Sequence, residues 1–143
     1  MKVIDNYIEQ MLQSTPNFPL WNQERIRANK KAGWNYIDGC MLTAFIKLYE
    51  RKNDEKYLRF VKNYIDFFIE EDGNIKTYNK TDFNLDDINE GRILFTLYDI
   101  FGDEKYKNAM RLLYSQLEKQ PRTIEGNFWH KKIYPNQVWL DGL

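Results

Sequence analysis

The chain repeats itself over about 50 residues, and this repeat limits its fold more than any other feature. The segment Leu48–Tyr57 returns 49 residues later as Leu97–Tyr106, with a Leu-Tyr pair at the start and Asp-Glu-Lys-Tyr at the end of both. Asp54 and Asp103 stand where a helix N-cap is expected, and Gly102 suits the left-handed residue that ends a helix. Each repeat therefore predicts an αα-hairpin, two helices joined by a short turn.

Apolar residues recur every three or four positions, the period of an α-helix, in five segments. The expected helices cover residues 2–13, 35–51, 55–70, 86–101 and 104–119. No segment alternates polar and apolar residues for long enough to predict a clear strand, although short extended pieces are expected near 74–78 and 128–133.

Hairpins of this period stack side by side, and in helical toroids they close into a ring. A ring of six such hairpins needs about 300 residues, roughly twice the 143 present. A third unit begins near Trp139, so we expect a truncated chain. The fold class predicted is all-α, with αα-hairpin repeats forming part of a six-hairpin toroid and residues 1–143 forming one domain.

Charge and composition exclude several classes of function. The 21 basic residues equal the 21 acidic ones, which argues against a nucleic-acid or membrane-surface partner. Cys40 is the only cysteine, so no internal disulfide and no cysteine-based metal site is expected. No signal peptide, membrane-spanning run, metal motif or phosphate loop is recognisable, which predicts a cytoplasmic protein without a cofactor.

Aromatic and acidic residues recur where one set of parallel helices begins, in the segments Trp34–Gly39, Leu85–Gly91 and Trp139–Gly142. In a toroid these helix starts converge on one end of the ring, so residues distant in sequence would line one cleft. The alternative for each acid is a first-turn residue that complements the helix dipole, and we assign Asp38 to that role. The alternative for the aromatic residues is a place in the core or at its rim.

Several segments together resemble the unsaturated rhamnogalacturonyl hydrolases of glycoside hydrolase family 105 and their relatives in family 88. The matching segments are Trp34-Asn35-Tyr36 with Gly39, Leu85-Asp86-Asp87-Ile88 with Gly91, Glu125–Lys131, Tyr134-Pro135 and Trp139–Leu143. The resemblance begins near Trp34 and is most specific in the last twenty residues. It implies that residues 1–143 are the N-terminal part of an (α/α)6 barrel, in agreement with the hairpin period.

The resemblance also implies an unusual reaction in pectin degradation. Members of these families act on oligosaccharides whose non-reducing end is a 4,5-unsaturated uronic acid. An acid protonates C4, water adds at C5, and the resulting hemiketal opens to release the sugar as a keto acid. The resemblance assigns Asp141 as the general acid/base and Asp86 as its partner carboxylate, with Asp87 as the alternative partner.

The same resemblance implies the substrate-binding residues, which are Trp34, Tyr36, Asp87, His130, Lys131 and Trp139. Tyr36 and Trp139 would offer flat faces to sugar rings, and His130 and Lys131 would meet the carboxylate or hydroxyls of the oligosaccharide. A lone histidine is more often a packing or capping residue than a catalyst, and this alternative stays open for His130.

Family members take further substrate-binding residues from later hairpins. We therefore expect the 143-residue chain to be inactive alone and to form homo-oligomers through the exposed edges of its open ring. The sequence is also compatible with two other functions. One is a non-catalytic helical-repeat module that binds saccharide or protein, and the other is a different (α/α)6 sugar-processing enzyme.

Overall fold

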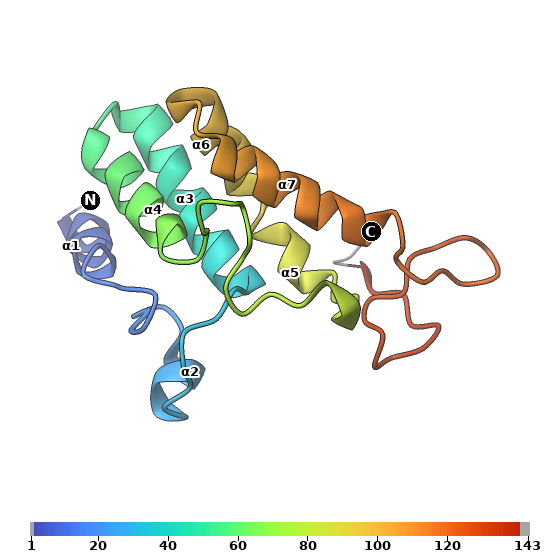
Figure 1. The fold of residues 1–143 in the computed structure, drawn as a ribbon. Helices are drawn as coiled ribbons and strands as arrows, with labels where there is room; N and C mark the ends of the chain where they lie inside the picture. The colour runs from blue at the N-terminus through green and yellow to red at the C-terminus, as the bar shows by residue number, and fades with distance from the viewer. Residues whose placement is uncertain (1, 141–143) are drawn as a thin grey trace.

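A computed structural model describes residues 2–140, which form two αα-hairpins, preceded by two helices and followed by a long loop (Figure 1). The helices are α1 (Lys2–Met11), α2 (Gln23–Arg27), α3 (Tyr36–Lys52), α4 (Glu55–Asp66), the 3-10 turn η1 (Lys80–Asp82), α5 (Asp86–Asn89), α6 (Arg92–Phe101) and α7 (Glu104–Leu117). Over this range the chain has only isolated β-bridges and no strand. The predicted fold class, all-α hairpin repeats belonging to an (α/α)6 barrel, is confirmed.

The turns of the two hairpins are built as the repeat predicts. The side chains of Asp54 and Asp103 accept hydrogen bonds from the second backbone N–H of α4 and of α7. The helices before these turns end in left-handed residues, Asn53 with φ 53° and Gly102 with φ 66°. The hairpin ends are therefore fixed by local sequence.

Two expected helices differ from those observed. The helix expected over 55–70 ends at Asp66, because the chain turns back at Gly73, whose φ is +88°, and Ile69 pairs with Ile75. The extended pieces expected near 74–78 and 128–133 are limited to isolated bridges that involve Ile75 and Phe128.

The helix expected over 86–101 is divided into α5 and α6 at Glu90 and Gly91. Packing accounts for this division, because both residues meet elements far away in the sequence. A Cβ added at Gly39 would lie 2.7 Å from the Cα of Glu90, and one added at Gly91 would lie 2.2 Å from Cδ1 of Leu113. The start of α6 is therefore held tightly between α3 and α7.

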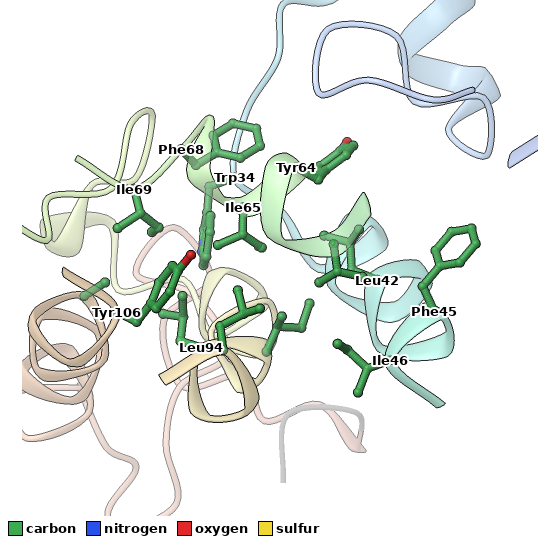
Figure 2. Close-up of a cluster of buried hydrophobic side chains, with 14 of the residues drawn as sticks. Trp34, Leu42, Phe45, Ile46, Tyr64, Ile65, Phe68, Ile69, Leu94 and Tyr106 are labelled. Carbon is green, nitrogen blue, oxygen red and sulfur yellow. The ribbon is translucent and has the colours of Figure 1, made fainter. Parts of the chain in front are cut away.

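The core lies where the two hairpins meet (Figure 2). α3 packs against α4 on one side and against α5 and α6 on the other, and α6 packs against α7. Leu42, Ile65, Leu94 and Tyr106, which come from all four long helices, are completely buried. Burying a Leu or Ile side chain contributes about 1.5–3 kcal/mol, so this shared core fixes how the hairpins stack.

The N-terminal helix α1 lies beside the first hairpin (Figure 1). Ion pairs join Asp5 to Lys52 and Glu9 to Lys56, and Met11 is buried. None of the helices in the described range is long and apolar enough to cross a membrane.

Candidate active site

The C-terminal loop closes on the short helix α5, which carries Asp86 and Asp87. The backbone N–H of Leu85 donates to the carbonyl of His130 at 3.0 Å, and the N–H of His130 donates to the carbonyl of Gln137 at 2.7 Å. The buried amide of Gln120 donates to the carbonyls of both Phe83 and Trp129, each at 2.8 Å. These bonds place the His130 loop directly beside α5.

Asp86 contacts two side chains of that loop, those of Lys131 and His130. Its Oδ2 is 2.6 Å from Nζ of Lys131, and its Oδ1 is 3.4 Å from Nε2 of His130. The side chains of Asp86 and Lys131 are both mostly buried, with exposed fractions of 21% and 23%. A charge-assisted pair at this depth is less screened than a surface pair, so Asp86 and Lys131 form a fixed charged pair at the site.

An aromatic stack covers His130. The rings of His130 and Trp139 are nearly parallel, with centroids 4.0 Å apart and an interplanar angle of 7°, and Tyr134 lies 5.9 Å from Trp139. His130 is buried, and neither of its ring nitrogens makes a hydrogen bond to the described residues. Trp139 keeps 41% of its surface exposed, and Nζ of Lys131 lies 5.9 Å from its ring centroid.

Asp87, on the same helix, is partly buried. Its carbonyl accepts a 2.6 Å hydrogen bond from Nε1 of the buried Trp34. Burial raises the pKa of Asp87 to about 6, and the nearby Asp86 adds to this rise while the Asn84 side chain and Lys131 oppose it. A carboxyl with such a pKa can hold a proton near neutral pH.

The structure brings together most of the residues predicted for the site. Asp86 forms an ion pair with Lys131 and lies 3.4 Å from Nε2 of His130, whose ring stacks on Trp139. Asp87 is adjacent to Asp86 in the chain. Trp34 is 5% exposed and supports α5 from the core, so the core alternative describes its ring better than a sugar-facing role. Tyr36 begins α3 and is 45% exposed. Asp141 lies outside the described residues.

Comparisons with known proteins identify the family of the chain. The family model described as Glycosyl Hydrolase Family 88 matches residues 7–143. The chain belongs to glycosyl hydrolase family 88.

Two similar proteins are considerably longer than this chain. The chain is 24% identical over 116 residues to the unsaturated rhamnogalacturonyl hydrolase YesR of Bacillus subtilis (strain 168), covering 77% of this chain and 32% of that protein. A solved glycoside hydrolase of family 105 from C. acetobutylicum ATCC 824 is 43% identical, with a TM-score of 0.76, and the match covers 86% of this chain and 35% of that one. The chain thus spans about a third of the length of these relatives.

Beneath this candidate site lies a buried polar network that the sequence interpretation missed. Asp38 is completely buried and accepts hydrogen bonds from Trp21 at 2.9 Å, Asn35 at 2.9 Å and Tyr64 at 2.8 Å. Nη1 of Arg25 lies 3.9 Å away. Asp38 does stand in the first turn of α3, but complementing the helix dipole is only part of its role, because its carboxylate joins α3 to α4 and to the segment around α2.

Glu90 is the second buried acid of this network. Its Oε2 accepts the backbone N–H of Asn35 at 2.7 Å, while its Oε1 has no partner among the described residues. Burial raises the pKa of Glu90 well above its usual value. The hydrogen bond ties the start of α3 to the junction of α5 and α6, and so helps to fix where Asp86 and Asp87 lie.

A sequence signal for both buried acids exists. Asp38 precedes Leu42 and Phe45 by four and seven residues, and Glu90 precedes Leu94 and Leu97 in the same way. These spacings place each acid on the buried face of its helix. Acids on an apolar stripe must be hydrogen-bonded or neutral, so the pattern predicts a buried network.

The raised pKa of Asp87 predicts how Asp87→Asn changes stability with pH. Folded Asp87 keeps its proton up to about pH 6, whereas an ordinary aspartate releases it near 3.8, so charging the folded site costs free energy as pH rises. The difference between these two pKa values corresponds to at most about 3 kcal/mol of unfolding free energy. Because Asp87 is partly exposed, we expect the variant to be more stable than wild type by about 1–2 kcal/mol at pH 7.5.

Urea denaturation of the 143-residue chain at pH 4 and pH 7.5 checks this prediction. The stability difference should nearly vanish at pH 4, where the native carboxyl is already neutral. The matched control is Asp99→Asn, which neutralises an exposed acid of α6. An Asp87→Asn variant that is less stable than wild type at pH 7.5 would contradict the prediction.

Proposed function

We propose that the protein carrying this chain is a hydrolase of pectin oligosaccharides, unsaturated rhamnogalacturonan fragments in particular, that end in a 4,5-unsaturated uronic acid. The observation that supports this most strongly is the position of Asp86, held by Lys131 and His130 beside a half-exposed Trp139. A carboxylate, a cation and a flat aromatic surface match the groups of a uronate ring. The name of one relative, unsaturated rhamnogalacturonyl hydrolase, favours the same substrate class.

The proposed reaction is hydration followed by ring opening. Asp141 donates a proton to C4 of the unsaturated sugar, and water adds to C5 after losing its own proton to a carboxylate. The hemiketal formed at C5 then opens by breaking its bond to the ring oxygen, which leaves a hemiacetal at C1. This hemiacetal breaks its bond to the glycosidic oxygen, the oxygen takes a proton, and the sugar leaves as a keto acid. Net addition is one water molecule, with no redox change.

The described residues have distinct parts in this proposal. Asp86 is the partner carboxylate, and Lys131 holds it while also attracting the carboxylate of the substrate. Trp139 offers its exposed surface to the sugar ring, and His130 supports Trp139 by stacking. Asp87, with a pKa near 6, is a second proton-holding group beside Asp86. Tyr36 contributes an exposed ring at the start of α3.

A substrate comparison tests the proposal. The complete gene product is incubated with lyase-treated rhamnogalacturonan, and the absorbance of the C4=C5 double bond is followed. We expect this absorbance to fall, while the same oligosaccharides made without the double bond stay intact. Cleavage of ordinary glycosides with the double bond untouched would instead identify a different (α/α)6 sugar enzyme. Binding without any conversion would identify a saccharide-binding module.

We also propose that the 143-residue chain associates with itself through the outer face of α6 and α7. Phe95 and Tyr114 are 62% and 63% exposed there, beside an apolar hollow of about 130 Å³ lined in part by Ile88, Met110 and Leu117. Burying apolar surface yields about 25 cal/mol per Å², and contiguous apolar patches are typical of contact surfaces.

Light scattering at micromolar concentration checks this association. We expect a dimer or larger species, and we expect the double variant Phe95→Ser, Tyr114→Ser to shift the chain toward monomer. The matched control is Ile124→Ser, which changes an exposed apolar residue of the C-terminal loop. A wild-type chain that is monomeric and unfolds cooperatively would overturn this proposal.

A further inference from the structure

A second hollow lies beside Ala32 and Thr77, and Thr77 is hydrogen-bonded to Trp34. The hollow has a volume of about 500 Å³ and is formed by the segment that leads into α3 and by the turn after α4. Its lining includes Lys30 and Lys31 from the first segment, Phe67 and Lys76 from the second, and also Asn17 and Asn29. This volume falls within the range of about 300–1,000 Å³ that small-molecule sites occupy.

The charged residues that line this hollow are all basic. Three lysines line it without any acidic residue, although the chain as a whole is neutral. Lys30 pairs with Glu24 at 2.9 Å, but both side chains are exposed, so the pair is weak. Lys31 forms no ion pair within residues 2–140. The cations of the hollow are therefore available to an anion.

The remaining groups of the hollow fit a sugar better than a simple anion. Phe67 is 38% exposed, and its ring is fixed by an edge-on contact with Phe68, at a centroid distance of 5.0 Å and an angle of 85°. Nζ of Lys76 donates to the carbonyl of Phe67 at 2.9 Å. An aromatic residue, two asparagines and nearby lysines are residue types that complement the C–H face, hydroxyls and carboxylate of a uronic acid. Nζ of Lys76 lies 5.4 Å from the centroid of the Phe67 ring.

The backbone around the hollow is held in an uncommon conformation. Asn29 and Thr77, which both line it, have φ values of 49° and 66°, and positive φ is rare for a β-branched residue such as threonine. Oγ1 of Thr77 accepts the N–H of Trp34 at 2.8 Å, and the indole of Trp34 holds α5 through Asp87. The wall of the hollow is thus joined to the candidate active site by two hydrogen bonds.

We propose that this hollow is a second saccharide site, separate from the Asp86 site, which binds a uronate-bearing oligosaccharide through Lys31, Lys76 and Phe67. The choice of a saccharide among anionic ligands rests on the proposed function. The site would hold a saturated part of an acidic polysaccharide, because nothing in it requires the C4=C5 double bond.

Amide NMR of the 143-residue chain tests this proposal with saturated digalacturonic acid as the probe. We expect saturable shifts of the amides of Ala32 and Thr77, and no matching shifts with the neutral disaccharide cellobiose or with acetate at equal carboxylate concentration. Lys31→Glu should weaken the affinity about tenfold, because it replaces an attracting charge with a repelling one. A tenfold change in affinity corresponds to about 1.4 kcal/mol of binding free energy. Lys119→Glu, an equal charge change at the end of α7, should leave the affinity within about twofold of wild type.

Several outcomes would overturn the second site. They are the absence of saturable shifts at Ala32 and Thr77, an equal response to acetate or to cellobiose, and an unchanged affinity in Lys31→Glu. Lys31 makes no ion pair within the described residues, so its variant is expected to fold, and a Lys76→Glu variant gives a second reading. The probe lacks the double bond, so its binding is independent of hydrolysis. Failure of the proposed reaction and failure of this site are therefore distinguishable.

Discussion

Asp86→Asn is expected to lower kcat on unsaturated uronyl oligosaccharides by about a thousandfold in the complete gene product. Asparagine keeps the shape of the side chain but cannot accept a proton, and it removes the charge that lies 2.6 Å from Nζ of Lys131. General acid–base groups contribute about 10²–10⁴-fold to rate. The unpaired ammonium of Lys131 can still attract the substrate carboxylate, so KM should change much less than kcat.

Initial rates of loss of the double-bond absorbance measure this effect. Asp99→Asn, on the exposed side of α6, is the matched control and should behave as wild type. We expect an equally large loss in Asp141→Asn, because the proposal gives the two carboxylates one shared task. An Asp86→Asn enzyme with kcat within tenfold of wild type would remove Asp86 from the mechanism.

Asp38→Ala is expected to destabilise the chain by about 4 kcal/mol, the largest stability effect we predict. The change leaves three donors without their acceptor, on Trp21, Asn35 and Tyr64, and all three now bind Asp38 within 2.9 Å. Each buried donor that loses its partner costs about 1–3 kcal/mol, and relaxation of the cavity recovers part of the sum. Arg25, 3.9 Å away, also loses its nearest carboxylate in this network.

Urea denaturation measures this loss, with Asp99→Ala as the exposed-acid control. Asp38→Asn should be less harmful, since its amide oxygen still accepts at least one hydrogen bond. A loss below about 1 kcal/mol in Asp38→Ala would show that the buried network adds little to stability.

The helices of this chain could be predicted because their signals are local. The caps at Asp54 and Asp103 and the left-handed Gly102 act within one turn of the chain, and the structure confirms them. The break between α5 and α6 could not be predicted, because it depends on Gly39 and Leu113, which are distant in sequence. The five residues of α2 are too few for a periodic pattern to emerge.

In the candidate site, too, some features could be predicted from the sequence and others could not. The clustering of Asp86, His130, Lys131 and Trp139 was expected from the resemblance to known hydrolases, and the structure places these four together. A core location for Trp34 was one of the two alternatives that the sequence left open, and the structure favours it. The hydrogen-bonding role of Asp38 was not expected. The spacing of Asp38 to Leu42 and Phe45 indicates that Asp38 is buried, but the partners of Asp38 and Trp34 come from distant segments and could not be predicted.

Isotope placement in the product tests the central proposal, hydration of the unsaturated uronic acid, most directly. The complete gene product is run on lyase-treated rhamnogalacturonan in D₂O and separately in ¹⁸O-labelled water. The released sugar is examined by NMR and mass spectrometry at early time points, before its carbonyl oxygens and the hydrogens at C4 exchange with the labelled water. We predict deuterium at C4 and ¹⁸O at C5, since water adds across that double bond. Labelled oxygen only at C1, with the double bond intact, would contradict the proposal and indicate direct attack at the anomeric carbon.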